Sequence, residues 1–286
     1  MRVHRAREHL QRCDLCPRGC HVNRLLTTRG AACRTGERAK IYSAGPHHGE
    51  ERPLSGWNGS GTIFLSWCSL TCVFCQNWEI SHRGEGHEVT AGELADLMLG
   101  LQEAGCHNIN FVTPSHVVAQ ILAAVEIAAN RGLRLPLVWN SGGYDSPEAL
   151  VLLDGVIDLY MPDMKFADSA IARKYLGAED YAEVNRAAVK EMHRQVGDLV
   201  IVAGVARRGL LVRHLVLPGN LAGTDQILAF LAQEISIDTY LNLMNQYRPC
   251  CRADKYPPLD RRPTHTEMAA VRAMAEALGL RRLDKG

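Results

Sequence analysis

The sequence predicts an α/β fold, a partial (β/α)6 TIM-like barrel preceded by a cysteine-rich metal-binding segment. Three observations predict it. Strand-like and helical stretches alternate from residue 61 onward, polar residues follow the strands, and seven of the ten cysteines fall into two tight groups. Strands that alternate with helices form parallel sheets covered by helices. Six such units are too few for a closed eight-fold barrel, and a partial barrel is preferred here over a doubly wound sheet.

Six short runs rich in apolar and β-branched residues are the expected strands. They span residues 61–67, 107–113, 133–140, 155–163, 210–218 and 238–245. Helices are expected at 90–105, 114–132, 146–154, 168–196, 224–235 and 264–279. The first of these helices has an N-terminal capping box, Thr90 followed three residues later by Glu93. The helix at 114–132 is opened by a proline and closed by a glycine, and the helix at 224–235 is also expected to be capped.

Four regions follow from composition along the chain. Residues 1–40 are cysteine-rich and have little apolar periodicity, so they require a metal or the main domain to become ordered. Residues 41–60 are rich in Gly and Pro and are expected to form an irregular loop. The partial barrel is assigned to 61–245, and a C-terminal tail with one helix to 246–286.

The overall composition is that of an ordinary globular protein. The 286 residues are 47% hydrophobic and 22% charged, and the net charge is +1. This balance gives no strong field that would attract nucleic acid or a membrane surface. The opening MRVHRAREHLQRC lacks the apolar region of a secretory signal, and no window reaches the roughly 18 apolar residues of a membrane span. We therefore expect a cytoplasmic protein without nucleic-acid or membrane partners.

The sequence WCSLTCVFCQ places Cys68, Cys72 and Cys75 directly after the first strand. In a reducing compartment, clustered cysteines bind metal or perform redox chemistry. Three thiolates are one short of a structural zinc site, whereas a 4Fe–4S cluster held by three thiolates keeps one iron open for an outside ligand. The alternative is a closed zinc site whose fourth ligand is Cys106 or a histidine.

The C-x3-C-x2-C spacing, with Phe74 before the last cysteine, resembles the signature of the radical S-adenosylmethionine (SAM) enzymes. Further blocks, HHGEERPLSGWNGSG, VTPSHV, NSGGY, YMPDMKF and RHLVLPGN, resemble the pyruvate formate-lyase activating enzyme-like branch across nearly the whole chain. The resemblance implies that SAM binds the open iron of the 4Fe–4S cluster. It also implies that one-electron reduction cleaves SAM to methionine and a 5′-deoxyadenosyl radical, which abstracts hydrogen from a substrate.

The same resemblance implies partners. The electron donor would be a protein such as flavodoxin or ferredoxin. The substrate would be the backbone glycine of a glycyl-radical enzyme, or instead a small molecule or peptide. The chain departs from true activating enzymes in two ways that favour the second option. Their Gly-Gly-Glu after the second strand is replaced by FVTPSH, and the extra cysteines here precede the radical motif.

The resemblance assigns SAM contacts to residues at the strand ends. Asp163 and Lys165, in YMPDMKF, correspond to a D-x-K element that positions SAM. Asn140 and the glycines after it suit ribose or methionine contacts. Thr113, or a carbonyl near it, must replace the missing Gly-Gly-Glu. These residues follow three different strands, and parallel strands present their carboxyl ends at one edge.

Arg213 and His214 are consecutive in one strand, so their side chains point to opposite faces. By analogy with the family, Arg213 is expected to face the barrel interior and clamp a carboxylate of SAM or substrate. His116 is either a helix-start residue or a neighbour of SAM. The loop before the first strand contributes four acid–base groups that are either substrate ligands or solvated. These are His47, His48, Glu50 and Glu51.

A second group of cysteines, Cys13, Cys16, Cys20 and Cys33, offers four ligands and can close a metal site. Structural zinc and an auxiliary 4Fe–4S cluster both fit. Because nothing indicates a vacant coordination position, a closed structural site is slightly favoured. The alternative without a metal is that the four cysteines are free thiols, although four cysteines in 21 residues are hard to explain by packing alone.

Vicinal Cys250 and Cys251 are taken to be incidental. A function of another class also fits the cysteines. The chain could be an iron–sulfur electron-transfer or binding protein that never cleaves SAM. Such a carrier supplies a fourth cysteine to each cluster, and only the N-terminal group has four. The radical SAM interpretation is therefore preferred.

Overall fold

A computed structural model describes residues 1–284, so the last two residues of the predicted tail, 285–286, lie outside it. Within the described part, the sheet has nine strands in the order β3-β1-β2-β4-β5-β6-β8-β7, and β9 pairs with β8. Six of them are parallel and adjacent in chain order. They are β2 (Ser60–Leu65), β4 (Ile109–Val112), β5 (Leu137–Ser141), β6 (Leu159–Pro162), β8 (Val205–Leu215) and β9 (Tyr240–Met244).

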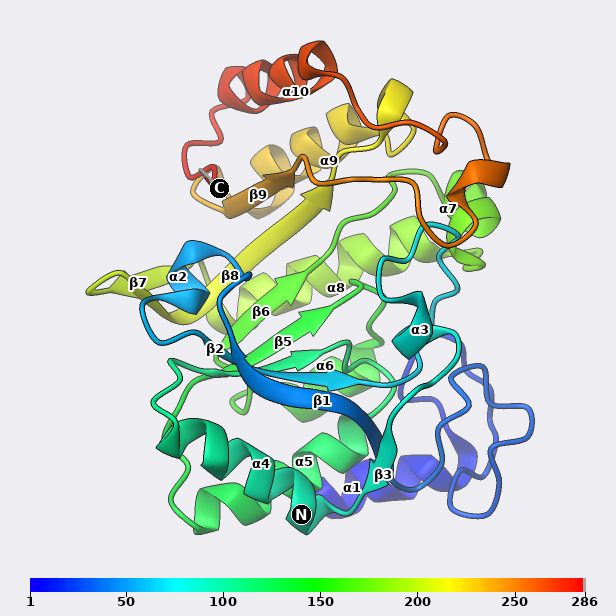
Figure 1. The fold of residues 1–286 in the computed structure, drawn as a ribbon, viewed down its shortest axis with the longest axis vertical. Helices are drawn as coiled ribbons and strands as arrows, with labels where there is room; N and C mark the ends of the chain where they lie inside the picture. Colours follow the sequence, from blue (N-terminus) through cyan, green and yellow to red (C-terminus); the bar gives the residue numbers. More distant parts are fainter. Residues whose placement is uncertain (285–286) are drawn as a thin grey trace.

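The six parallel strands coincide with the six predicted ones. Their order never reverses along the sheet, as it would in a doubly wound fold, and the sheet does not close. The predicted partial barrel is therefore confirmed. Figure 1 shows the strands fanning across the molecule with their carboxyl ends toward the same side.

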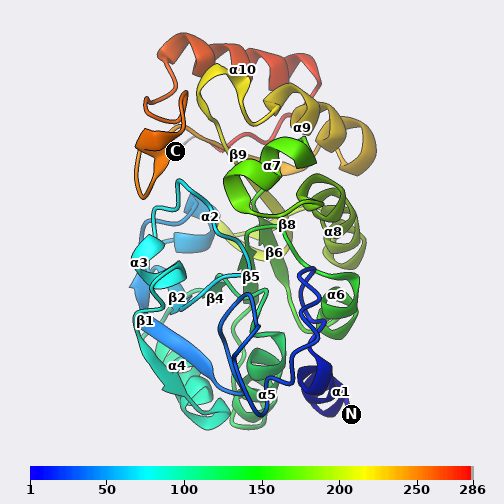
Figure 2. The same ribbon diagram turned by 90° about the vertical axis from the view of Figure 1, so that its right-hand side faces the viewer.

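Helices cover the outer face of the sheet, as Figures 1 and 2 show. They are α4 (Ala91–Glu103), α5 (Val118–Asn130), α6 (Pro147–Leu153), α8 (Tyr181–Val196) and α9 (Thr224–Phe230). Two more helices pack on these, α7 (Ser169–Leu176) against α8 and α10 (His265–Ala277) against α9. The predicted capping box of Thr90 and Glu93 is present. The helical region expected over 168–196 is present as two helices, because the chain turns at Gly177, which has a φ of 67°. Within residues 1–284, every helix is too short or too polar to span a lipid bilayer.

Two helix starts differ from expectation. The helix predicted from residue 114 begins at Val118, because Pro114 and the three residues after it form a turn closed by Val117 N–H donating to the Pro114 carbonyl. At α9, Thr224 is already helical, and Asn220 Oδ1 accepts from its backbone N–H at 2.9 Å. The capping side chain of this helix therefore comes from the preceding turn.

The irregular loop predicted over 41–60 is wrong. The segment contains β1 (Ala39–His47), which pairs antiparallel with β2, and the short helix α2 (Arg52–Ser55). Beyond Ile41 most β1 side chains are exposed, so no apolar alternation marks the strand. Its backbone hydrogen bonds to the free edge of β2 hold it in place instead. The other edge of β1 carries β3 (His87–Val89).

Three further helices and strands were not predicted, α1 (Arg2–His9), α3 (Trp78–Ser81) and β7 (Val200–Val202). The N-terminal helix is strongly basic, but its Ala6 is completely buried, as is Leu15 beyond it. Both belong to the same hydrophobic cluster as Phe111 and Trp139 of the central strands. The barrel core therefore orders the N-terminal segment.

Candidate cluster and cofactor site

The loop that carries three cysteines begins where β2 ends. Trp67 has a φ of 69°, in the left-handed region, and so reverses the chain immediately before Cys68. Its indole lies against Gly84, where an added Cβ would be 2.1 Å from the ring. Only glycine tolerates that approach. Further along, Thr71 and Val73 donate their N–H groups to carbonyls at the end of α7, which fixes the loop.

All three thiols of this loop, Cys68, Cys72 and Cys75, are free and line one cavity of about 90 Å³. Burial raises the pKa of Cys68 to about 11 and raises the pKa of Cys72 further. As thiols they are protonated at neutral pH, so metal binding would release their protons. Cys106 is excluded as a fourth ligand, because it precedes β4 and lies at the opposite end of the parallel strands.

A larger cavity of about 320 Å³ continues from the first. The two share Cys72, Cys75, Thr113, Asp163 and Lys165 in their walls. The cavities therefore form one continuous space at the carboxyl ends of the strands. All five predicted SAM contacts line this space along with the cysteines. They are Thr113, Asp163, Lys165 and, in the larger part, Asn140 and Arg213.

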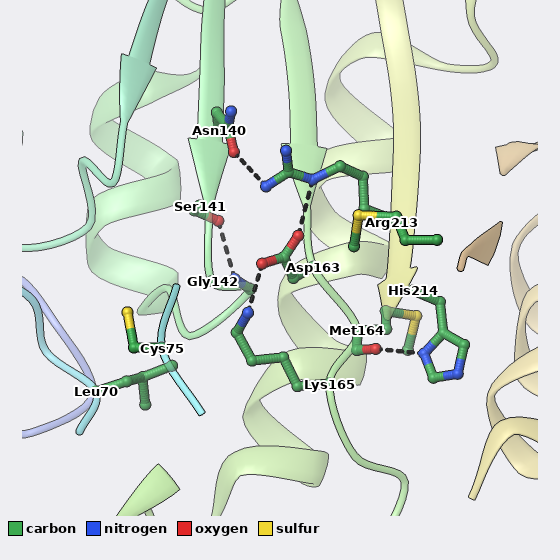
Figure 3. A network of polar contacts seen from close by, with 12 residues as sticks. Leu70, Cys75, Asn140, Ser141, Gly142, Asp163, Met164, Lys165, Arg213 and His214 are labelled. Carbon is green, nitrogen blue, oxygen red and sulfur yellow. Dashed lines mark hydrogen bonds and ion pairs between the residues drawn. The ribbon is translucent and has the colours of Figure 1, made fainter. Parts of the chain in front are cut away.

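Asp163 is the centre of a polar network in this space (Figure 3). Its Oδ1 accepts from Arg213 Nε at 2.8 Å, and its Oδ2 accepts from Lys165 Nζ at 2.5 Å. Arg213 Nη2 also donates to Asn140 Oδ1 at 2.7 Å. Burial alone would raise the pKa of Asp163, but the charges of Arg213 and Lys165 outweigh it and lower that pKa. The carboxylate is therefore ionised, and it holds two cations over the cavity.

Arg213 faces the interior and His214 faces away from it, as predicted. His214 is fully buried on the other face of β8. Its Nδ1 lies 2.6 Å from the Met164 carbonyl, and its Nε2 lies 2.8 Å from Thr224 Oγ1. A carbonyl can only accept, so Nδ1 carries the proton and Nε2 accepts from the Thr224 hydroxyl. His214 is thus a neutral structural residue that joins β8 to α9.

The turn after β5 also approaches Asp163 closely. Gly143 has a φ of 70°, and a Cβ there would lie 2.2 Å from the Asp163 carbonyl oxygen. Tyr181 Oη and Asn185 Nδ2 donate to the same carbonyl at 3.1 and 3.0 Å. The second glycine of NSGGY is therefore required by this contact. His116 lines neither cavity, and its Nε2 instead lies 2.9 Å from the Ser66 carbonyl.

The second cysteine group lies beside the first. Cys13, Cys16 and Cys33 are buried, and Cys20 is partly buried. Two N–H groups donate to sulfur at 3.4 Å, Arg24 Nη1 to Cys13 Sγ and Ala32 N to Cys20 Sγ. In residues 1–284, however, no group of three or more His, Cys, Asp or Glu side chains is arranged to hold a single metal ion. Metal binding at this group stays a prediction.

The C-terminal segment contacts the cysteine loop in a way that the sequence did not indicate. Arg252 N donates to the Val73 carbonyl at 2.8 Å, and Cys250 Sγ to the Phe74 carbonyl at 3.2 Å. Cys251 Sγ lies 3.8 Å from His82 Nδ1, and His82 lines the smaller cavity. No spacing pattern connects residues 176 positions apart, so only the fold could reveal this contact.

Known proteins resemble this chain in sequence and in fold. The uncharacterized protein MJ0674 of Methanocaldococcus jannaschii is 30% identical over 289 residues, covering 98% of this chain and 79% of MJ0674. A radical SAM methyltransferase from Sphaerobacter thermophilus superposes with a TM-score of 0.50 at 14% identity, covering 79% of this chain and 67% of the methyltransferase. The chain belongs to one family with MJ0674 and has the radical SAM fold.

Two other solved structures have lower similarity. A domain of a pyruvate-formate lyase-activating enzyme from Bacteroides vulgatus gives a TM-score of 0.40 at 12% identity, covering 57% of this chain and 90% of that domain. A structure of TYW1 with a lysine-pyruvate adduct gives 0.44 at 13% identity, covering 76% of this chain and 73% of TYW1. No protein-family model matches the chain.

A radical SAM fold implies a 4Fe–4S cluster and SAM, and the residues present fit both. Three free thiols at one cavity suit a cluster with an open iron. SAM presents a carboxylate, an ammonium and ribose hydroxyls. Lys165 and Arg213 supply cations for a carboxylate, and Asn140 and Thr113 supply hydrogen-bonding groups in the adjoining space. All lie at the carboxyl ends of the strands.

Proposed function

We propose that this chain is a radical SAM enzyme. In it, Cys68, Cys72 and Cys75 hold a 4Fe–4S cluster, and the adjoining cavity holds SAM. One observation carries the proposal. Three free thiols and the Asp163 network line one continuous space at the carboxyl ends of a parallel partial barrel. When bound and reduced, the cluster and SAM would supply a 5′-deoxyadenosyl radical that abstracts hydrogen from a substrate.

The residues of the chain have separate tasks in this proposal. Asp163 fixes Lys165 and Arg213 so that their positive charges are oriented before a ligand arrives. Asn140 holds the far side of the Arg213 guanidinium and limits its rotation. Cys72 is buried and Cys68 and Cys75 are partly buried, so bulk water, which would compete for the open position of the cluster, would have limited access.

The substrate is proposed to be a small molecule or peptide rather than the glycine of a glycyl-radical enzyme. The space lacks the Gly-Gly-Glu block of true activating enzymes and has Thr113 in its place. The electron donor is proposed to be a flavodoxin- or ferredoxin-like protein, since the cluster must receive one electron at a time. The N-terminal cysteines are proposed to hold a second metal.

Production of 5′-deoxyadenosine tests the proposal. Protein reconstituted anaerobically with iron and sulfide is given dithionite and SAM, and the nucleoside is quantified. Wild type and Cys106→Ala, which removes a buried thiol outside the site, are expected to form it, and Cys72→Ala is not. No product from protein that holds a spectroscopically verified cluster, with candidate peptides present, would instead favour an electron carrier.

A further inference from the structure

The carboxylate of Glu50 lines the larger cavity, and no side chain of residues 1–284 forms a hydrogen bond with it. Glu50 follows β1, its side chain is 9% exposed, and it lines the space with Asp163 and Arg213. The turn that carries it is fixed, because Asn242 Nδ2 of β9 donates to Glu51 Oε1 at 2.8 Å. This turn spans from the β2 side of the open barrel to β9 and so places Glu50 inside.

Two side-chain nitrogens lie near the Glu50 carboxylate, and both are beyond hydrogen-bonding distance. Arg213 Nη1 lies 3.7 Å from Oε2, and His47 Nδ1 lies 3.6 Å from Oε1. Among the residues that the structure describes, none donates a hydrogen bond to this carboxylate, which forms only the longer contacts with Arg213 and His47. The buried His47 Nδ1 likewise has no hydrogen-bonding partner. A carboxylate accepts several hydrogen bonds, so the Glu50 oxygens that face the cavity have capacity left for the donors of a ligand. Such a group in a cavity is expected to receive a donor from a ligand.

Among the described residues that line this space, the two cations are already engaged with other groups. Arg213 and Lys165 both bond to Asp163, and Arg213 also bonds to Asn140. Glu50 is absent from the wall of the smaller cavity, which contains all three loop cysteines. The resemblance of this chain to the superfamily implies that SAM binds the cluster through its amino and carboxylate groups. The amino group of SAM is then engaged at the cluster. The partner of Glu50 then belongs to the substrate.

We propose that Glu50 binds a cationic nitrogen of the substrate, a primary ammonium or a guanidinium such as a lysine or arginine side chain carries. The proposal rests on the proposed radical SAM function and narrows its substrate class. A cation with several N–H donors satisfies the carboxylate and neutralises it in one contact. His47 Nδ1 then lies beside the same site and can bond a neighbouring polar group of the substrate.

Three probes of matched shape test this proposal, Nα-acetyl-lysine amide, Nα-acetyl-arginine amide and the uncharged Nα-acetyl-norleucine amide. Their binding to cluster-loaded protein with SAM is measured by calorimetry. A cationic probe is expected to bind wild type at least ten-fold more tightly than the norleucine probe. Glu50→Gln, which keeps the side-chain shape, is expected to abolish that preference, and the exposed Glu88→Gln is expected to retain it.

Three outcomes would overturn the proposal. They are equal binding of charged and uncharged probes, an unchanged preference in Glu50→Gln, and no binding of any probe. SAM affinity is measured in the same variants, and a ten-fold loss in Glu50→Gln alone would assign Glu50 to SAM instead. Formation of 5′-deoxyadenosine by wild type is measured separately, so its absence counts against the radical SAM function and not against the cation site.

Discussion

Arg18 Nε donates a 2.7 Å hydrogen bond to the carbonyl oxygen of Ser69, 51 residues along the chain. Arg18 also donates through Nη1 to the Gly177 carbonyl, and its guanidinium lies 5.6 Å from the ring centroid of Tyr144. Arg18 lies between Cys16 and Cys20, and Ser69 lies between Cys68 and Cys72. One side chain therefore joins the two cysteine loops, which lie side by side in Figure 1.

Replacing Arg18 with alanine is expected to loosen the loop that carries Cys68, because the carbonyl groups of Ser69 in this loop and of Gly177 after α7 lose a charged donor. Hydrogen bonds to charged groups contribute about 1.5–3 kcal/mol each, so a stability loss of about 2 kcal/mol is expected. Iron per chain and the rate of cluster loss to a chelator measure the effect. Arg18→Lys should restore part of it, and the exposed Arg29→Ala should match wild type. Cluster loss at the wild-type rate in Arg18→Ala would contradict this coupling.

Metal analysis of a Cys16→Ser variant addresses the N-terminal group. Four ligands close a site, so we expect loss of one zinc per chain with the iron at the Cys68 loop retained. Loss of about four irons instead would identify an auxiliary 4Fe–4S cluster. Both results agree with a second metal site. An unchanged metal content in the variant would mean that these cysteines are free thiols.

Asp163→Asn is expected to weaken SAM binding. The substitution leaves Arg213 and Lys165 without their shared anion, so both side chains lose the orientation that the carboxylate gives them. We expect at least a ten-fold increase in the Kd for SAM, about 1.4 kcal/mol, and a loss of about 3 kcal/mol in unfolding free energy. Calorimetry and urea denaturation measure the two effects. The surface variant Asp96→Asn serves as control, and unchanged SAM binding in Asp163→Asn would remove Asp163 from the site.

His214 predicts a specific dependence of stability on pH. Burial lowers its pKa from the ordinary 6.5 to about 4. Above pH 6.5 the residue is neutral in both states, so its contribution is complete. As pH falls from 6.5 to 4, only the unfolded chain takes up the proton, and about 3 kcal/mol of stability is lost. His214→Gln should flatten the curve in that window by a similar amount, and exposed His265→Gln should not. Parallel curves for wild type and His214→Gln would refute the assignment.

The position of the site was predictable from local sequence. The three loop cysteines and Asp163 each follow an apolar run, and parallel strands end at one edge, so their convergence needed no tertiary information. The interior placement of Arg213 followed from the alternation of side chains along a strand, once the resemblance indicated which neighbour to choose. The capping box at Thr90 was similarly local, since its bonds join residues three positions apart.

Other features depended on contacts that no local pattern encodes. Strand β1 has an exposed outer face, and it exists because the free edge of β2 offers backbone hydrogen bonds. Glu50 enters the cavity because the turn after β1 is tied to Asn242, nearly two hundred residues away. The contact of Cys250 with the Phe74 carbonyl also joins segments far apart in the chain. The sequence by itself determined which cysteines share one loop and where the strands end, because periodicity and spacing are local. Only the tertiary structure decided which charges pair with one another, because pairing depends on distances between segments far apart in the chain.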